Sequence, residues 1–187
     1  MNFKTFYRNV YRVVYGKFHP IEYAKKIGVN INGNVHLYGK VSWSTEPWII
    51  TIGDDVYITD GVYITDGVKF LTHDGGTLLF RKYVPDLEIT KPITIGNHVY
   101  IGNNVIILPG VNIGNNVIIG AGAVVSKDIP DNSVAVGVPA RVIKSADDYF
   151  EKIKKESLHL GHLKGEEKDK KLKEYYGYTG NSKGIYF

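Results

Sequence analysis

One histidine, His73, lies where the sequence changes character, in the stretch Thr72-His73-Asp74-Gly75-Gly76. An imidazole can accept a proton near neutral pH, so His73 is a candidate general base. A lone histidine in a surface loop is more often without catalytic function, so the surroundings of His73 decide whether it can be a general base. Asp74 is not the expected partner, because neighbours on an extended chain point to opposite sides.

The chain has no cysteine among its 187 residues. This excludes a cysteine nucleophile, a thiolate metal site and disulfides. The formal net charge is +4, which suggests an anionic partner without naming it. There is no apolar run of the roughly 18 residues that a membrane span needs, and no signal-peptide pattern. We therefore expect one soluble, cytoplasmic domain with appendages.

A repeat with a period of six residues surrounds His73. Aliphatic residues open the hexads, and smaller aliphatic residues, mostly valine, stand fifth in them. A period of six does not fit an α-helix but fits short strands joined at corners. The glycines at the second place, with the Asn and Asp beside them, are residue types that tolerate positive φ at such corners. Three hexads predict one triangular coil of eighteen residues, with successive coils about 4.8 Å apart. The opening residues are Ile52, Ile58, Ile64, Ile95, Ile101, Ile107, Ile113, Ile119 and Val125, with a weaker start at Ile31 and Leu37.

The repeat is interrupted by residues 71–93. Ile52 and Ile95 are 43 residues apart, one more than a multiple of six, so the hexads resume out of phase. A stacked prism can extrude such a segment as a loop, and a loop of about twenty residues is more often functional than not. His73 lies at the root of this loop, where a rigid coil can hold it.

This pattern resembles the left-handed parallel β-helix of the hexapeptide-repeat acetyltransferases, over roughly residues 27–144. The greatest likeness is to galactoside and maltose O-acetyltransferases and to polysaccharide-biosynthesis acetyltransferases. The resemblance implies an all-β core, a triangular prism of hexapeptide repeats with an extruded loop and helices at both ends. The domain organisation follows: an N-terminal helical cap (1–26), the β-helix domain (27–144) and a C-terminal helical tail (145–187).

The resemblance also implies the chemistry of His73. In this family a histidine in this position is the general base of a direct acetyl transfer from acetyl-CoA. The predicted function is O-acetylation of a saccharide or sugar derivative. N-acetylation of an amino sugar, free or nucleotide-linked, or of an antibiotic is the alternative, and His73 serves both reactions.

The segment IGAGAVVSKDIPDNSVAVGVPARVIK, residues 119–144, resembles the coenzyme A end of these enzymes. Small residues there admit the pantetheine arm, and basic residues match positions near its phosphates. At the position of Lys144 the most similar enzymes carry arginine. The cofactor-binding residues carried over by position are Asn103, Ala121, Ser126, Lys127, Arg141 and Lys144.

The acceptor is less well specified. Glu46 occupies roughly the place of an acidic residue that orients the sugar hydroxyl in related enzymes. Trp43 and Trp48 can stack on a sugar ring or cap the end of the prism. Both readings stay open for the tryptophans.

The chain ends are predicted to be helical. Residues 2–18 carry basic and aromatic side chains in an amphipathic pattern, which permits peripheral membrane contact but more often caps the open end of a prism. Residues 147–159 and 166–176 read as helices with balanced charges, which does not indicate a nucleic-acid site. Members of the family are trimers with active sites between neighbouring prisms, so the resemblance implies a homotrimer.

Two other classes of protein can use the same prism. A metalloenzyme like the γ-carbonic anhydrases needs three converging histidines, and His36, His73 and His98 lack the clustered pair on adjacent coils. No metal is therefore expected. A scaffold prism without catalysis leaves the long loop and the basic end of the repeat unexplained.

Overall fold

The structure is a computed structural model that describes residues 14–58 and 67–180. The chain forms two compact units, Met1–Asp147 and Asp148–Phe187. The first unit holds all the strands of the described residues, and the second holds helix α4 (Gly165–Tyr176) and most of helix α3 (Ala146–Glu156). The predicted helices 147–159 and 166–176 are thus confirmed, with ends that differ by at most three residues.

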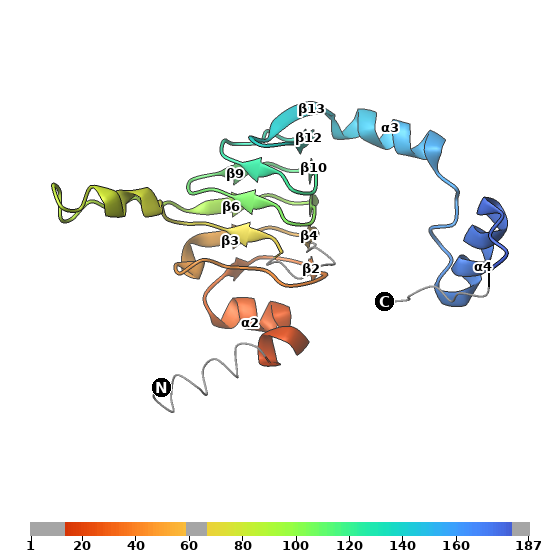
Figure 1. Cartoon of the computed structure of the whole chain (residues 1–187), viewed down its shortest axis with the longest axis horizontal. Helices are drawn as coiled ribbons and strands as arrows, with labels where there is room; N and C mark the ends of the chain where they lie inside the picture. Colours follow the sequence, from red (N-terminus) through yellow and green to blue (C-terminus); the bar gives the residue numbers. More distant parts are fainter. Residues whose placement is uncertain (1–13, 59–66, 181–187) are drawn as a thin grey trace. The chain divides into compact units, whose positions relative to one another are not determined.

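In the described part of the first unit, thirteen short strands form three sheets (Figure 1). Sheet A has the order β1-β3-β6-β9, sheet B the order β13-β12-β10-β7-β4-β2, and sheet C the order β11-β8-β5. Every strand pair is parallel except β12 with β13. The strands are β1 (Asn30–Ile31), β2 (Val35–Leu37), β3 (Ile50–Ile52), β4 (Val56–Ile58), β5 (Lys69–Phe70), β6 (Ile93–Ile95), β7 (Val99–Ile101), β8 (Ile106–Ile107), β9 (Asn112–Ile113), β10 (Val117–Ile119), β11 (Val124–Val125), β12 (Ser133–Val136) and β13 (Arg141–Ser145).

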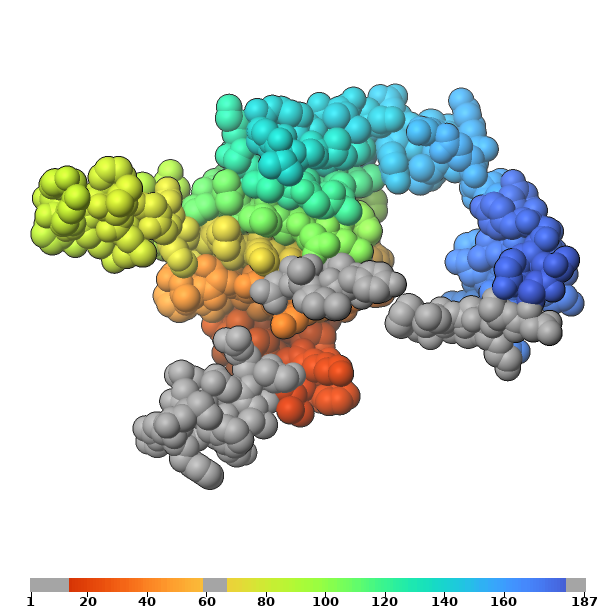
Figure 2. All heavy atoms as spheres, viewed as in Figure 1, coloured from red at the N-terminus to blue at the C-terminus, as the bar shows by residue number. Residues whose placement is uncertain are grey.

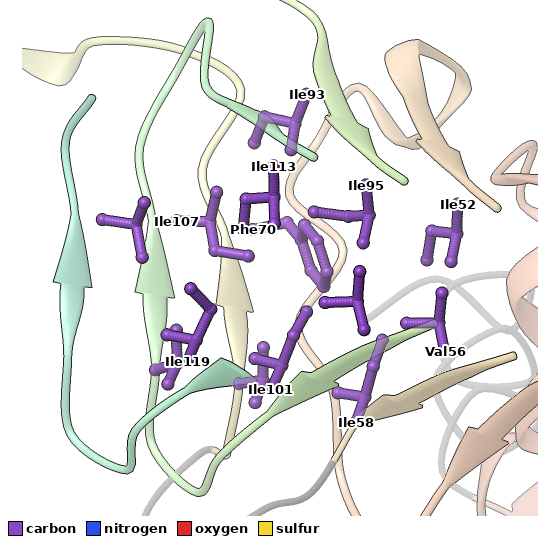
Figure 3. Close-up of a cluster of buried hydrophobic side chains, with 14 of the residues drawn as sticks. Ile52, Val56, Ile58, Phe70, Ile93, Ile95, Ile101, Ile107, Ile113 and Ile119 are labelled. Carbon is purple, nitrogen blue, oxygen red and sulfur yellow. The ribbon is translucent and has the colours of Figure 1, made fainter. Parts of the chain in front are cut away.

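From β3 to β11, successive strands along the chain enter sheets A, B and C in turn, so the chain winds as a three-sided stack of coils. The register confirms the predicted eighteen-residue coil, since Ile95 pairs with Ile113 and Ile101 with Ile119. Among the described residues, the hexad-opening aliphatics from Ile52 onward are buried, and those labelled in Figure 3 point into the stack. Burying this column of β-branched side chains is the main stabilising contribution to the coils.

The connection between β4 and β5 contains more residues than the one between β7 and β8 in the next coil. Ile58 pairs with Ile101, and Phe70 pairs with Ile107. Phe70 therefore lies twelve positions after Ile58, whereas Ile107 lies only six positions after Ile101 in the next coil. The hexad predicted to open at Ile64 lies outside the described residues. Phe70 fills the interior of this coil, where its ring stacks on Trp43 with centroids 5.1 Å apart.

The corners differ from the prediction in how glycine is used. The positive φ angles at the corner between sheets A and B belong to residues beside the second-place glycines, with φ of 54° at Asp55, 55° at His98 and 54° at Asn116. Gly96 is required instead for close stacking, because a Cβ there would lie 2.5 Å from the carbonyl oxygen of Gly114. The second-place glycines therefore let adjacent coils approach, while Asn, Asp and His make the turn.

A column of side chains crosslinks the coils at this corner. The Asp54 amide donates to Asn97 Oδ1 at 2.8 Å, the Asn97 amide to Asn115 Oδ1 at 2.9 Å, and the Asn115 amide to Asp131 Oδ1 at 2.7 Å. Each of these side chains therefore accepts a hydrogen bond from a backbone N–H at the turn, where the hydrogen bonding between strands ends.

Helix α2 (Pro20–Lys26) lies at the start of the stack and packs against β2. Its Ala24 is fully buried and belongs to the same core as the isoleucines. Residues 14–18 are helical as predicted, whereas the rest of the predicted segment 2–18 lies outside the described residues. No helix among residues 14–58 and 67–180 is long and apolar enough to cross a membrane.

Candidate active site

His73 lies at the foot of a loop, residues 71–92, that leaves the stack after β5 and returns at β6 (Figures 1 and 2). The Leu71 amide still bonds to the Ile107 carbonyl oxygen at 2.9 Å, so the chain is part of the wall until two residues before the histidine. The two legs of the loop are then joined on both sides of His73, with Lys91 N to Thr72 O at 2.8 Å and Asp74 N to Ile89 O at 2.9 Å. The backbone of His73 is thus fixed by the coil and by the returning leg.

Glu46 reaches His73 because the preceding coil runs alongside β5. Ser42 pairs in parallel with Lys69, and the Ser44 hydroxyl accepts a hydrogen bond from the Thr72 amide at 3.2 Å. Ser44 has a φ of 64°, which turns the chain before the short 3-10 helix η1 (Pro47–Ile49). This turn directs Glu46 toward the root of the loop.

The Glu46 carboxylate accepts three hydrogen bonds from side chains. His73 Nδ1 lies 3.0 Å from Oε2, the Thr72 hydroxyl 2.6 Å from Oε2, and the Thr45 hydroxyl 2.5 Å from Oε1. An ionised carboxylate only accepts, so the Thr72 proton goes to Glu46. The Ser44 hydroxyl, 2.7 Å from Thr72 Oγ1, must then donate to Thr72.

These contacts lower the pKa of Glu46 to about 2. The hydrogen bond from Thr45 is the largest cause and that from Thr72 is next. Burial opposes them, and the hydrogen bond and charge of His73 lower the pKa by smaller amounts. Glu46 is therefore ionised near neutral pH and holds the hydrogen of His73 on Nδ1. The lone pair of the neutral imidazole is then on Nε2, the atom that can accept a proton from a substrate.

A pocket of about 270 Å³ opens in front of this pair. Its walls come from the Glu46 segment and from the loop, including the 3-10 helix η2 (Gly75–Leu79). The lining residues are Thr45, Glu46, His73, Asp74, Gly75, Thr77, Leu78, Arg81 and Glu88. Among the sequence-predicted site residues, the structure brings His73 and Glu46 together here.

Trp43 is not in the pocket. It is only 6% exposed and belongs to the core, where it stacks on Phe70 at an interplanar angle of 14°. The sugar-stacking role considered for Trp43 is therefore corrected to packing at the end of the prism. Trp48 is 63% exposed and does not line the pocket. Asp74 caps η2 by accepting from the Gly76 amide, in agreement with the expectation that it is not the partner of His73.

Four of the six residues predicted to bind coenzyme A lie at two different edges of sheet C. Ser126 and Lys127 follow β11 directly and are exposed at the same edge as His73. Because β11, β8 and β5 stack in this order, they are two coils from His73, or roughly 10 Å along the stack. Asn103 and Ala121 precede β8 and β11, so they lie at the opposite edge.

Arg141 and Lys144 lie on β13, at the C-terminal end of the stack. Arg141 is exposed, and its Nη1 donates to the Ala140 carbonyl oxygen at 2.9 Å. Lys144 stands opposite Val134 in the antiparallel pair. Both residues lie away from the pocket of His73, because β7 and β10 separate β12 from β4, the sheet B strand of the coil that contains β5.

The hydroxyls around Glu46 were not predicted from the sequence. Thr45, Thr72 and Ser44 are common residue types, and only the stacking of two segments, 26 to 28 positions apart, brings them together. The only sign in the sequence that one of these hydroxyls belongs to the site was that Thr72 directly precedes His73. The ion pair of Arg81 with Glu88 on the loop was also missed.

The histidines considered for a zinc site have other surroundings. His36 stacks on Tyr57 with centroids 4.3 Å apart and lies 3.9 Å from Asp55, while His98 occupies a corner of the coil. In the described part of the chain no group of three or more His, Asp or Glu side chains could hold a metal ion. The three histidines do not converge.

The hexad repeat that builds these stacked coils is also found in known transferases. Residues 92–127 match the family model of the bacterial transferase hexapeptide, six repeats. Protein CapG of Staphylococcus aureus is 44% identical over 146 residues, which cover 77% of this chain and 81% of CapG. Galactoside O-acetyltransferase of Escherichia coli K12 is 40% identical over 136 residues, 70% of this chain and 64% of that enzyme.

Solved structures agree with these relatives. A maltose O-acetyltransferase from Clostridium difficile 630 has a TM-score of 0.50 and 30% identity, over 66% of this chain and 73% of that one. A galactoside acetyltransferase in complex with coenzyme A has a TM-score of 0.50 and 35% identity, over 70% of this chain and 71% of that one. The chain belongs to the hexapeptide-repeat acetyltransferase family, which confirms the predicted family and class of enzyme.

Proposed function

We propose that this protein transfers the acetyl group of acetyl-CoA to a hydroxyl of a saccharide, with His73 as general base and Glu46 as the residue that orients it. The single observation that carries the proposal is the hydrogen bond of 3.0 Å between His73 Nδ1 and Glu46 Oε2 at the wall of a pocket. The names of the relatives, galactoside and maltose O-acetyltransferase, support a sugar acceptor and a coenzyme A thioester donor.

Nε2 of His73 performs the proton transfers. It takes the proton of the acceptor hydroxyl while the hydroxyl oxygen bonds to the thioester carbonyl carbon. The tetrahedral intermediate then collapses, the carbon–sulfur bond breaks, and the sulfur of coenzyme A receives the proton from Nε2. No bond forms between the acetyl group and the enzyme, so this is a direct transfer in a ternary complex.

Glu46 supports both halves of the reaction. Its negative charge stabilises the imidazolium that exists between the two proton transfers, and its position keeps the Nδ1–H tautomer in place. The role differs from the acceptor-binding role predicted for Glu46, in which the carboxylate contacts the sugar hydroxyl. A carboxylate that accepts three hydrogen bonds from the protein has little capacity left for an acceptor hydroxyl.

The proposal includes a left-handed prism that assembles as a homotrimer, and the placement of the coenzyme A residues supports an active site shared between copies of the chain. Phe70 pairs with Ile107, so His73 lies three positions after this pair and Asn103 four positions before it. Seven positions of extended chain span roughly 20 Å, which is too far for one thioester to contact both residues. If the prisms associate head to tail, the edge with His73 in one copy can face the edge with Asn103 and Ala121 in the next.

The donor would then run along the edge of His73 toward Ser126 and Lys127, with Arg141 and Lys144 nearer its phosphates. Arginine suits a phosphate through its planar donor fork, and lysine acts as a point charge. A cytoplasmic location, where acetyl-CoA is available, is part of this proposal.

The test is thiol release from acetyl-CoA with a panel of neutral sugars, amino sugars and nucleotide sugars. We expect release with a saccharide, followed by isolation of an O-acetyl ester that alkali hydrolyses. An alkali-stable amide product would instead show N-acetylation of an amino sugar, the alternative for the same site. Release with none of the acceptors would refute the proposed function.

A further inference from the structure

An ion pair on the loop faces the pocket. Arg81 Nη2 bonds to Glu88 Oε2, Arg81 Nε donates to the Leu87 carbonyl oxygen at 3.0 Å, and the Thr90 hydroxyl donates to Glu88 Oε1 at 2.7 Å. Both charged residues line the same pocket as His73 and Glu46. Their geometry is therefore fixed in the part of the pocket wall that the loop supplies.

Loop stability alone does not explain this pair. The side chains of Arg81 and Glu88 are 40% and 51% exposed, and ion pairs this exposed contribute little to folding. The legs of the loop are joined by main-chain hydrogen bonds on both sides of His73, as described above. A pair that is held in one orientation at the rim of a pocket is better explained by recognition.

The pair offers both kinds of hydrogen-bonding group to a ligand. A guanidinium has five N–H donors, and contacts to Leu87 and Glu88 use two of Arg81's among the described residues. The Glu88 carboxylate keeps lone pairs beyond those that face Arg81 and Thr90. A donor next to an acceptor matches two neighbouring hydroxyls of a sugar ring, because one hydroxyl can accept while the next donates.

The charges around the pocket discriminate between acceptors. Three carboxylates, those of Glu46, Asp74 and Glu88, line it together with one guanidinium, that of Arg81. With His73 neutral, the lining has a formal charge of −2 from these four groups. This negative charge would repel a sugar ring that carries a carboxylate or a phosphate.

The volume limits the size of what enters. At about 270 Å³ the pocket holds about nine times the volume of a water molecule in the liquid. It lies just below the usual range of small-molecule sites. This suits one sugar ring, with the remainder of a longer saccharide outside.

We propose that Arg81 and Glu88 form the specificity subsite for the acceptor, which binds two neighbouring hydroxyls of an uncharged sugar ring and rejects rings that carry a carboxylate or phosphate. This rests on the proposed acetyl transfer to a saccharide and adds the class of ring and the residues that select it. Neither residue touches the reacting atoms in this scheme, so both are specificity residues.

The first experiment compares matched acceptors with the wild-type protein. Thiol release from acetyl-CoA is measured with glucose against glucuronate and with galactose against galacturonate, as their methyl glycosides. We expect kcat/KM to be at least about 10-fold higher for the neutral member of each pair. Equal values, or a preference for the uronates, would overturn the subsite while leaving acetyl transfer established.

The second experiment changes the two residues. We expect Arg81→Gln to raise KM for the neutral sugar about 10-fold, with kcat and the KM for acetyl-CoA within about 2-fold of wild type. Lys82→Gln is the matched control, because Lys82 is exposed on the same turn, does not line the pocket, and its removal changes the net charge equally. An unchanged KM for the neutral sugar in Arg81→Gln would overturn the proposal.

Glu88→Gln tests the rejection of anionic rings. We expect the ratio of kcat/KM between neutral and uronate acceptors to fall about 3- to 10-fold, because one repelling charge is removed. Asp86→Asn is its control, since Asp86 is exposed on the loop outside the pocket lining. A ratio that stays the same in Glu88→Gln would remove Glu88 from the subsite.

Arg81→Lys distinguishes recognition of the sugar by Arg81 from a purely structural role of its ion pair with Glu88. A lysine keeps the positive charge beside Glu88 but lacks the planar fork. We expect the KM of Arg81→Lys for the neutral sugar to stay well above that of the wild type. A KM equal to that of the wild type would assign a purely structural role to the ion pair and overturn the proposal. Failure of the wild-type protein to release thiol with any saccharide is a different result, because it refutes the proposed function itself.

Discussion

His73 Nδ1 lies 3.0 Å from Glu46 Oε2, although the two residues are 27 positions apart in the sequence. The carboxylate is held ionised by hydroxyls from Thr45 and Thr72, so the pair is arranged before any substrate arrives. An imidazole with its hydrogen on Nδ1 presents the lone pair of Nε2 to the pocket. The predictions below follow from this arrangement and from the stacking of the coils that creates it.

Replacing His73 with alanine should lower turnover by a factor of about 100 or more while the protein stays folded and binds coenzyme A. The reason is the loss of the only imidazole that lines the pocket among the described residues. Steady-state thiol release and calorimetric titration with coenzyme A measure the two quantities. His162→Ala, an exposed histidine in the second unit, should behave as the wild type. Near-normal turnover in His73→Ala would remove His73 from the mechanism.

Glu46→Gln should reduce kcat about 10- to 100-fold with a smaller change in the KM for either substrate. The amide keeps the size of the side chain but removes the charge that stabilises the imidazolium. It can also present an N–H to Nδ1 and so favour the wrong tautomer. An effect confined to the KM of the acceptor would favour the acceptor-binding role of Glu46 instead.

The stability of the protein should depend on the ionisation of Glu46. Its pKa is lowered from 4.5 to about 2, chiefly by hydrogen bonds from Thr45 and Thr72, so the folded state favours the charged form. This contribution is complete above pH 4.5 and is lost as the pH falls toward 2. Glu46→Gln should therefore lower the free energy of unfolding by about 1 to 2 kcal/mol at pH 7, and by less as the pH falls below 4.5. Urea unfolding at several pH values checks this, and a difference independent of pH would contradict it.

Mixing two inactive variants should restore activity if each site is shared between copies. His73→Ala removes the base at one edge of sheet C, and Ala121→Trp blocks the opposite edge, where Ala121 is exposed. In trimers reassembled from equal amounts, about one site in four would combine two intact edges from different chains. Recovery of about a quarter of wild-type turnover is expected. No recovery after verified subunit exchange would place the whole site in one chain.

Gly96→Ala should destabilise the stack by about 2 to 4 kcal/mol. A Cβ at this position would lie 2.5 Å from the Gly114 carbonyl oxygen, and neither backbone can move without opening the ladder between coils. Thermal unfolding measures the loss. Gly161→Ala is a suitable control, because a Cβ there meets no atom within 4 Å. An equal melting temperature for Gly96→Ala and the wild type would show that the coils can separate locally.

Much of the fold could be predicted from the sequence, because the period of the hexads is a local property. An aliphatic residue every six positions indicates a coil of eighteen residues, and the structure pairs Ile95 with Ile113 accordingly. The position of His73 at the end of the repeat also follows from a local change in composition. The family resemblance then assigned it a role.

What the sequence by itself determined is therefore the repeating coil, the loop that interrupts it and the histidine at its root. Only the tertiary structure decided which residues of neighbouring coils meet, namely Glu46 with His73 and Trp43 with Phe70. It also decided that Arg81 and Glu88 of the loop pair at the pocket. The segments that carry Glu46 and Arg81 break the period of six, so no local pattern gives their register. Contacts between coils depend on how many residues each corner and loop takes up, and that count is settled when the whole stack packs around one core.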